Sequence, residues 1–437
     1  MTRLRTTILA AAAGAALCLT APACSSDKGA TQETIGSPPR TNDKLSPRDS
    51  SADDPNADRK VAPERLNPSE GGEDGGTAPE KSEGGADEDG DPSLARASAD
   101  LPGQGRAAGA QEDNLLFQGE ARLANLRMLT HGGQNAEAYL SPSETQLVFQ
   151  STRDDLQCDQ IFTMKIDGSE PRLVSTGTGA TTCAYFLPDG QSVLYASTHK
   201  ADPACPPKPD FGKFGGYVWP IHDTFDIYVA PLAGGPPRIL TSSPGYDAEA
   251  TVSPKGDRIV FTSTRDGDLD LYSMKIDGSD VRRLTQALGY DGGAFFSQDG
   301  RQIVYRAHHP TGEEANEYKR LLKEGVVKPS VMELFVMNAD GSGSRQITAF
   351  GAASFAPFFH PDGKRVIFAS NLHDPKGRDF DLYTVRVDGS GLERITYNPS
   401  FDGFPMFTAD GKKLVFASNR AGKVRGETNV FVADWVE

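Results

Sequence analysis

One phrase is written six times along this chain, and it constrains the fold more than any other feature. The phrase consists of a turn of the Pro-Asp-Gly type, an apolar run ending in Ser or Ala, an acidic residue before an aromatic-rich run, Asp-Gly, and finally Leu-Thr or Ile-Thr. Its clearest copy comprises residues 253–256 (Ser-Pro-Lys-Gly), 259–261 (Ile-Val-Phe), 270–272 (Asp-Leu-Tyr), 277–278 (Asp-Gly) and 284–285 (Leu-Thr). Such a period predicts a stack of identical supersecondary units, none of which buries its apolar face alone.

The spacing of the copies indicates the type of unit. The turns lie at Pro142, Pro188, Pro254, Gln298, Pro361 and Ala409. Three of the intervals between them are about 44–48 residues, which is typical of a four-stranded propeller blade, and two are near 65. Runs of strand length between Gly, Pro and Asp turns favour four short antiparallel strands per blade, here called a to d from the axis outward.

The two ends of the repeat region complement each other. The sixth copy has strand-like runs at 404–407, 414–417 and 430–433 but lacks the final Leu-Thr run. A matching segment, 126–130, precedes the first copy, and joining both ends in one blade closes the ring and removes exposed edges. The sequence therefore predicts an all-β fold over residues 115–437, a six-bladed β-propeller closed three-plus-one by an N-terminal strand.

Residues 1–24 have the features of an export signal. Arg3 and Arg5 precede an apolar stretch, 8–19, that is too short to span a bilayer comfortably. The following residues 20–26, Thr-Ala-Pro-Ala-Cys-Ser-Ser, resemble the lipobox of bacterial lipoproteins, although Ala21 stands where Leu is preferred. The resemblance implies lipidation of Cys24, anchorage to a membrane and delivery to the outer membrane; plain secretion after Ala23 is the alternative.

Residues 25–114 are rich in Gly, Pro, Ser, Asp and Glu and almost free of aromatic residues. A segment of this composition cannot bury enough apolar surface to offset its ordering entropy, so we predict a disordered acidic linker. Most of the chain's net charge of −15 lies here. Nucleic acid is not expected as a partner, because the chain lacks the clustered Lys and Arg that bind phosphates.

The repeat phrase resembles the PD40 repeat, the TolB-like and WD40-like propeller repeat, over the whole of residues 115–437. Segments 158–162, 182–186 and 217–220 are similar to a TolB-like subgroup of envelope proteins, some of which are fused to peptidase domains. Within the family, TolB is a periplasmic member of the Tol–Pal system and binds a peptidoglycan-associated lipoprotein at its propeller. This chain departs from TolB, because a linker replaces the N-terminal α/β domain and TolB carries no lipid anchor.

Two insertions account for the two long intervals. They are expected at 200–223 in blade 2 and 310–330 in blade 4, both in b–c loops and therefore on one face. The first is rich in Pro and aromatic residues, among them Tyr217, Trp219 and His222, and suits either recognition of a peptide, protein or sugar or simple capping of the propeller. The second predicts a helix, with Thr311 and Glu314 as a capping box and Gly325 at its end.

Charged residues recur on the same face. We expect acids in the d–a loops at the channel mouth: Glu137, Asp247, Glu249, Asp291 and Asp402. Strand b ends with Arg in three blades, Arg153, Arg265 and Arg420, but with His199 and His309 in two. An acid repeated in nearly every blade favours ion pairs that tie strands together over ligand binding. The candidate binding residues are Tyr217, Trp219, His222, His199, His309, Asp247, Glu249, Asp291 and Asp402.

The cysteine and histidine residues are the candidates for a disulfide and for a metal site. Cys158, Cys183 and Cys205 all map to the insertion-bearing face, where an oxidising compartment predicts one disulfide and one remaining thiol. Which two pair cannot be deduced from spacing, and we select Cys158–Cys183. His222, His308 and His373 also lie on this face, but no HxH or HExxH spacing supports a metal site. No metal or cofactor is predicted.

The function predicted from the sequence is that of a lipid-anchored, monomeric binding module for a protein, peptide or glycan of the cell envelope. No GxSxG nucleophile motif and no Walker-type phosphate loop occur in the chain. Two alternatives remain open. One is a propeller enzyme of the metal-assisted polysaccharide lyase type, and the other is an accessory module of a separately encoded peptidase.

Overall fold

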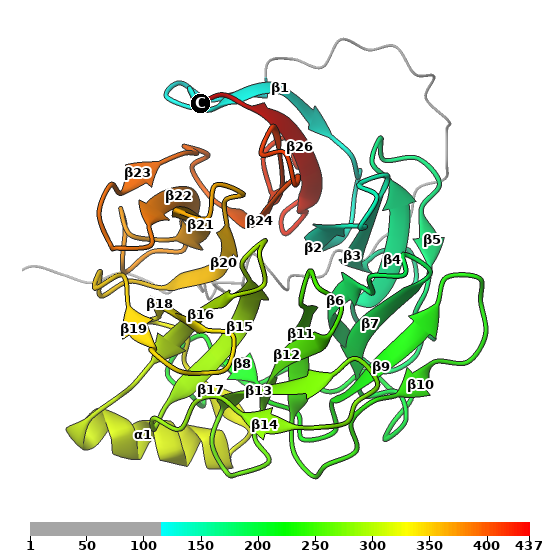
Figure 1. Ribbon diagram of the computed structural model, residues 1–437, viewed down its shortest axis with the longest axis vertical. Helices are drawn as coiled ribbons and strands as arrows, with labels where there is room; N and C mark the ends of the chain where they lie inside the picture. The colour runs from blue at the N-terminus through cyan, green and yellow to red at the C-terminus, as the bar shows by residue number, and fades with distance from the viewer. Residues whose placement is uncertain (1–114) are drawn as a thin grey trace, which may run out of the picture. The chain divides into compact units, whose positions relative to one another are not determined.

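Residues 115–437 are described by a computed structural model, and they form a six-bladed β-propeller (Figure 1). The predicted signal peptide, Cys24 and linker lie outside the described residues. Each blade is a four-stranded antiparallel sheet, as the repeat phrase predicts. No helix among the described residues is long and apolar enough to cross a membrane.

The strands of each blade run in the order a to d. Blade 1 holds β2 (Gln134–Leu140), β3 (Gln146–Thr152), β4 (Gln160–Lys165) and β5 (Arg172–Leu173). Blade 2 holds β6 (Thr181–Phe186), β7 (Ser192–Ser197), β9 (Asp226–Pro231) and β10 (Arg238–Ile239). Blade 3 holds β11 (Asp247–Val252), β12 (Arg258–Ser263), β13 (Asp270–Lys275) and β14 (Arg282–Arg283).

The remaining blades follow the same order. Blade 4 holds β15 (Tyr290–Phe296), β16 (Gln302–His308), β18 (Glu333–Asn338) and β19 (Arg345–Gln346). Blade 5 holds β20 (Ser354–Phe359), β21 (Arg365–Ser370), β22 (Asp381–Arg386) and β23 (Glu393–Arg394). Blade 6 holds β24 (Asp402–Phe407), β25 (Lys413–Ser418), β26 (Asn429–Trp435) and β1 (Leu123–Met128).

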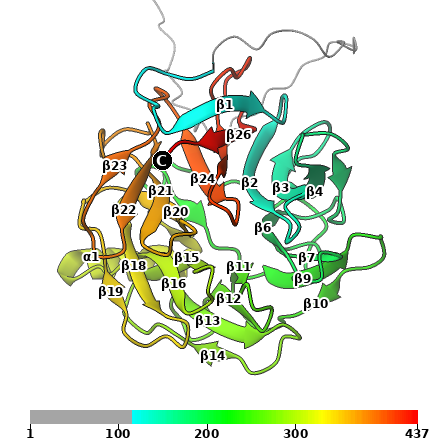
Figure 2. The ribbon, with the colours of Figure 1, turned by 45° about the horizontal axis from the view of Figure 1, so that its top comes forward.

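The N-terminal strand closes the ring. β1 pairs antiparallel with β26, with Leu123 opposite Trp435 and Met128 opposite Phe431. Figures 1 and 2 show this N-terminal strand lying against the last strand of the chain. The three-plus-one closure predicted from the missing Leu-Thr run is therefore confirmed. It leaves the outer edge of blade 6 covered in the same way as the other blades.

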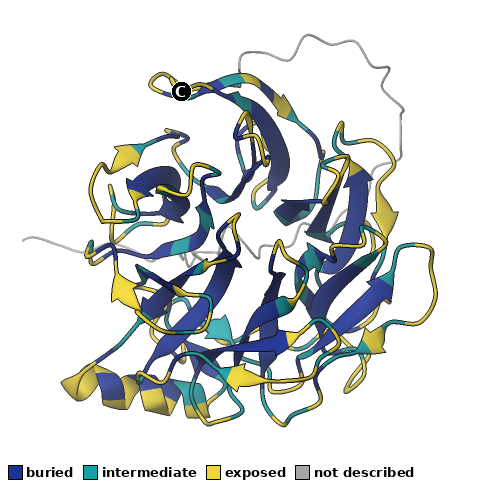
Figure 3. Ribbon diagram, viewed as in Figure 1, coloured by how far each residue is buried: buried dark blue, intermediate teal, exposed yellow. Residues whose placement is uncertain are grey.

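A pair of aromatic rings repeats in every blade and forms the core of the propeller. The fourth residue of each strand b is aromatic and buried: Phe149, Tyr195, Phe261, Tyr305, Phe368 and Phe416. Each ring packs on an aromatic residue of strand c, and the ring centroids lie 5.5–6.2 Å apart. Figure 3 shows the result, with the inner strands buried and the short outermost strands and connecting turns largely exposed. Burial of these large rings accounts for the aromatic residues in the repeat phrase.

The threonine of Leu-Thr joins strand d to strand c. In blade 3 the Leu271 amide donates to Thr285 Oγ1 at 2.9 Å, and that hydroxyl donates to Asp270 at 3.3 Å. The same pair of bonds recurs with Thr396 and Asp381 in blade 5. The acid at the start of strand c is therefore a structural part of the repeat, as expected for a residue found in nearly every blade.

The two insertions meet and form a small sheet. β8 (Trp219–Pro220) pairs antiparallel with β17 (Val326–Val327). The predicted helix is present as α1 (Gly312–Lys323), and it ends before Gly325, whose φ is +75°. Its capping box is not formed, because Thr311 makes no side-chain cap and Glu314 instead contacts His308 Nε2 at 3.0 Å.

Candidate functional site

Every innermost strand carries a bulge at the same place. The register of strand a against strand b shifts in all six blades, and at each shift one residue adopts a left-handed backbone with φ between +50° and +57°. These residues all line the cavity at the propeller axis, and we call them the channel ring: Glu137, Cys183, Glu249, Gly293, Ala356 and Phe404. A bulge redirects a side chain, and here it supplies one residue per blade to the channel.

The acids predicted for the d–a loops lie instead in the innermost strands, and they fall into two groups. Asp247, Asp291 and Asp402 stand two residues before the ring and are buried. Each contacts the basic residue that follows strand b, namely Arg265 at 2.9 Å, His309 at 2.9 Å and Arg420 at 2.8 Å respectively. None of these three acids lines the cavity, whereas Glu137 and Glu249, which are ring residues, do.

The two histidines that replace arginine belong to this structural layer. His309 contacts Asp291, and the hydrogen bond to that carboxylate raises the His309 pKa. His199 stands opposite the neutral Thr181, contacts Ser197 Oγ at 2.8 Å and packs on Tyr228 with centroids 4.4 Å apart. Burial lowers the His199 pKa. Neither histidine lines the cavity.

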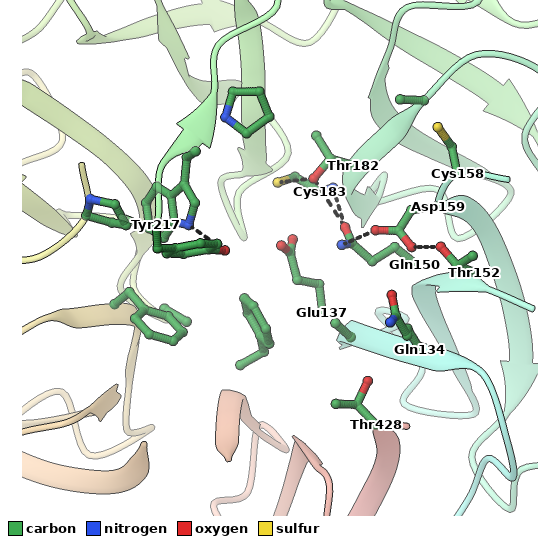
Figure 4. A pocket seen from close by; sticks show the side chains of 18 of the residues that line it. Gln134, Glu137, Gln150, Thr152, Cys158, Asp159, Thr182, Cys183, Tyr217 and Thr428 are labelled. Carbon is green, nitrogen blue, oxygen red and sulfur yellow. Dashed lines mark hydrogen bonds between the residues drawn. The ribbon is translucent and has the colours of Figure 1, made fainter. Parts of the chain in front are cut away.

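The cavity on the insertion-bearing face has a volume of about 1600 Å³. Three predicted binding residues of the blade 2 insertion, Tyr217, Trp219 and His222, line it together with the channel ring. Trp219 Nε1 donates to Tyr217 Oη at 3.2 Å, which holds the two rings together. Figure 4 shows Tyr217 across the opening from Glu137 and Cys183. Burial lowers the pKa of His222, so its imidazole is neutral near pH 7.

A chain of polar side chains runs outward from Cys183 along blade 1 (Figure 4). Thr182 Oγ1 lies 3.1 Å from Cys183 Sγ and donates to Gln150 Oε1 at 3.2 Å. Gln150 Nε2 donates to Asp159 at 3.2 Å, and Thr152 also donates to that carboxylate. In blade 1 Gln160 and Ser175 take the places of the strand c acid and the repeat threonine, and Ser175 Oγ donates to Gln160 at 2.7 Å. Asp159 stands one residue before that position and lines the cavity.

Glu249 forms a closed cluster with Arg306 and Tyr290. The Arg306 guanidinium is ion-paired with Glu249, and Tyr290 Oη donates to the same carboxylate at 2.8 Å. The Gly293 amide donates to Glu249 at 3.0 Å. Only glycine fits at 293, because a Cβ there would overlap the guanidinium of Arg306. The channel-ring position of blade 4 therefore carries no side chain. The guanidinium of Arg306, from strand b, lies beside it instead.

Glu137 differs from Glu249 in its surroundings. Burial in the channel and the nearby charge of Glu249 raise its pKa to about 7, although a hydrogen bond with the Cys183 thiol acts in the opposite direction. Burial and the two neighbouring carboxylates raise the pKa of Cys183, so the thiol stays protonated. Glu137 is thus a carboxyl group that changes its charge near neutral pH.

Blades 5 and 6 contribute a cluster of aromatic rings to the opposite half of the cavity. Phe355 and Phe404 pack with centroids 5.8 Å apart, Phe355 and Phe380 at 5.0 Å, and Phe401 and Phe404 at 6.2 Å. All four line the cavity. The cavity therefore presents an aromatic cluster from blades 5 and 6, which also contribute basic side chains, to a polar, acidic wall from blades 1 to 3.

The predicted Cys158–Cys183 disulfide is wrong. Cys158 pairs with Cys205, with 5.7 Å between their Cα atoms, and Cys183 is the free thiol. The reason is the ring geometry, because the bulge of β6 directs Cys183 into the channel. The disulfide joins the blade 2 insertion to the b–c loop of blade 1, while β8 and β17 join it to blade 4.

The structure does not bring the candidate histidines together around one point. Among the described residues, His373, Asp379 and Asp381 form a group with the spacing of metal ligands. His373 Nε2 lies 3.0 Å from Asp379, and Asp381 is also ion-paired with Arg394. Asp381 keeps its structural bond to Thr396, so the group belongs to the strand c layer of blade 5.

The sequence matches one family model. The model of the TolB β-propeller domain, PD40, matches residues 218–324 and 325–431, which run from the outer strands of blade 2 into β26 of blade 6. The chain belongs to the TolB-like β-propeller repeat family. No curated protein matches this TolB-like chain in sequence.

Several solved structures are similar to this TolB-like propeller. A protein assigned as TolB from Agrobacterium tumefaciens is 21% identical, with 71% of this chain and 94% of that chain covered and a TM-score of 0.46. TolB from Acinetobacter baumannii is 17% identical, with 69% and 63% covered and a TM-score of 0.45. An oligogalacturonate lyase from Vibrio parahaemolyticus is 14% identical, with 70% and 79% covered and a TM-score of 0.44. At these identities the likeness is limited to the fold.

Proposed function

We propose that this TolB-like propeller is a non-catalytic binding module that receives a protein, peptide or glycan of the cell envelope in the cavity at its axis. The observation that carries the proposal is the cavity itself, about 1600 Å³ in volume and lined by an aromatic insertion on a rigid six-bladed scaffold. A cavity of this size exceeds what a small metabolite fills. Tyr217 and Trp219 offer large and rigid contact surfaces there.

The blade 2 insertion is held in place at several points, which supports its proposed role in binding. The disulfide holds the insertion at Cys205, and the β8–β17 pairing holds it at Trp219 and Pro220. Phe214 and Val218 pack with Leu321 and Val326 of the second insertion. A loop that is already ordered loses less conformational entropy when it binds a partner, which favours affinity.

The N-terminal residues 1–114 bear on where the module is located. We propose that Cys24 carries a lipid and that residues 25–114 tether the propeller to a membrane of the cell envelope, on the basis of the lipobox-like segment 20–26. The test is detergent phase partition of the full-length protein and of Cys24→Ser. Partition of the wild-type protein into the detergent phase, lost in the variant, supports the anchor; equal partition of both overturns it.

The binding proposal is tested by capture of partners from intact cells. Cross-linking followed by mass spectrometry is compared for the wild type, Tyr217→Ala and Leu392→Ala, a residue exposed on blade 5 outside the cavity. We expect the partners to be lost in Tyr217→Ala and kept in Leu392→Ala, with unchanged thermal midpoints. Retention of every partner by Tyr217→Ala would remove the cavity from the proposal.

A further inference from the structure

Glu137 differs from the other acids of the innermost strands in its partners. Four other acids of the innermost strands have a basic partner: Asp247 has Arg265, Asp291 has His309, Asp402 has Arg420, and Glu249 has Arg306. Among residues 115–437, no lysine, arginine or histidine forms an ion pair with Glu137. Arg306 favours its charged form only from a distance, because the guanidinium contacts Glu249 and Tyr290.

We infer that Glu137 is the recognition point for the lysine or arginine side chain of a peptide bound in the cavity. This inference deepens the proposed function and rests on it. It names the cationic group that the acidic wall of the channel selects, and it favours a peptide over a neutral glycan. The carboxylate would receive the ammonium or guanidinium group in a charge-assisted hydrogen bond.

The walls around Glu137 match the rest of such a side chain. Lysine and arginine carry three or four methylene groups between backbone and charge, and these pack well on apolar surfaces. Phe404, Phe355 and the adjoining aromatic residues provide that surface within the same cavity. A cation that is close to these rings also gains from their quadrupole.

The other ring residues leave Glu137 available. The Cys183 thiol is protonated and therefore uncharged, while the residues Gly293 and Ala356 are too small to fill the channel. Glu249 is already neutralised by Arg306. A ligand cation therefore meets one uncompensated carboxylate in the channel ring.

Titration of the carboxyl group provides an independent signature. With its pKa at about 7, Glu137 is mostly protonated at pH 6 and mostly charged at pH 8. A cation binds the charged form, so affinity should fall about tenfold from pH 8 to pH 6. The titratable and charged groups that act on Glu137 are Cys183, Glu249, Arg306 and Asp159. Burial raises the pKa of the Cys183 thiol well above its usual range and also raises the pKa of Asp159.

The experiment uses the fluorescence of Trp219, one of two tryptophans in the chain and a cavity residue, whereas Trp435 lies in β26. The full-length protein is titrated with acetyl-Gly-Lys-Gly-amide, with its norleucine counterpart, and with n-hexylammonium at pH 8. We expect the lysine peptide to bind at least about tenfold more tightly than the norleucine peptide, and hexylammonium to bind more weakly because it lacks the peptide backbone.

The variants separate the carboxylate from the fold. Glu137→Gln should weaken binding of the lysine peptide about tenfold and abolish the pH dependence, while the norleucine peptide is unaffected. Leu392→Ala, at an exposed position outside the cavity, should keep the preference for lysine and its pH dependence, and circular dichroism verifies that both variants fold. Equal binding of the lysine and norleucine peptides, hexylammonium binding as tightly as the lysine peptide, or a Glu137→Gln variant within twofold of wild type would overturn the inference.

Failure of this inference can be told apart from failure of the proposed function. If lysine selectivity is absent but cellular partners are still lost in Tyr217→Ala, only the cation subsite is refuted. If Tyr217→Ala retains all partners, the cavity is not the binding site, whatever the probes do.

Discussion

Arg420 contacts Glu120 at 3.0 Å in a fully buried ion pair, although the two residues stand 300 positions apart. The same guanidinium also contacts Asp402 at 2.8 Å and lies over the ring of Phe117 at 5.3 Å. The segment before β1 is thereby fixed to blade 6 by charge as well as by strand pairing. Closure of the propeller therefore also involves a few residues that precede β1, the closing strand predicted from the sequence.

Loss of Glu120 should destabilise the propeller strongly. Glu120→Ala leaves Arg420 buried with one of its two carboxylates missing, and removal of one partner of a buried pair typically costs about 3–5 kcal/mol. Glu393→Ala is the matched control, because its pair with Arg122 is exposed and contributes at most about 1 kcal/mol. Urea unfolding followed by circular dichroism measures both. Equal losses in the two variants would refute a special role for the buried pair.

Gly293→Ala should disrupt the Glu249–Arg306 cluster. The new Cβ overlaps the guanidinium, and the backbone at φ +57° disfavours any side chain, so we expect a loss of about 1–3 kcal/mol. Ala356→Gly is the control at the equivalent position of blade 5, where φ is +50° and glycine relieves strain. Thermal unfolding should rank Ala356→Gly at or near the wild type and Gly293→Ala well below it; the reverse order contradicts the ring geometry.

The Cys158–Cys205 disulfide should stabilise the protein, and Cys183 should not. The bridge closes a segment with a sequence separation of 47 residues, for which the chain-entropy relation gives about 4 kcal/mol. Cys205→Ser should lower the thermal midpoint, and reductant should then have no further effect on the midpoint. Cys183→Ser should leave the wild-type midpoint unchanged, and reductant should still lower it. A Cys158–Cys183 peptide in a non-reducing digest would contradict the pairing.

Stability should depend on pH through Glu137. Its pKa is raised in the folded state to about 7, so the folded protein binds the proton more tightly than the unfolded chain. Folding is therefore penalised above pH 7 and the penalty disappears as the pH falls toward the unfolded value near 4.3. The wild type should gain stability relative to Glu137→Gln between pH 8 and pH 5, measured by urea unfolding. A difference that is constant with pH would show that the pKa is not raised.

The fold could be predicted because each part of it depends on local chemistry. Turn residues and repeat spacing determine the blades, and the absent sixth Leu-Thr indicates the closing strand. The end of the helix at 312–323 follows from Gly325. Its cap does not, because Glu314 finds a tertiary partner in His308.

The site was only partly predictable. The insertion and its aromatic residues were found from the interruption of the repeat, but Glu137 was grouped with Asp247 although the two occupy different positions in the strand. The signal that separates them is present in the sequence, since each ring residue stands two positions after the buried residue that faces the end of strand b. The bulge that turns the ring residues inward, and with it the orientation of Cys183, requires the paired strands.

The central claim is that partners bind in the cavity on the insertion-bearing face. A photo-cross-linking phenylalanine derivative placed at Tyr217 tests it most directly in living cells, with Asp189, an exposed turn residue on the opposite face, as the control position. We expect a cross-linked partner from position 217 and none from position 189. A partner captured from position 189 and not from position 217 would contradict it.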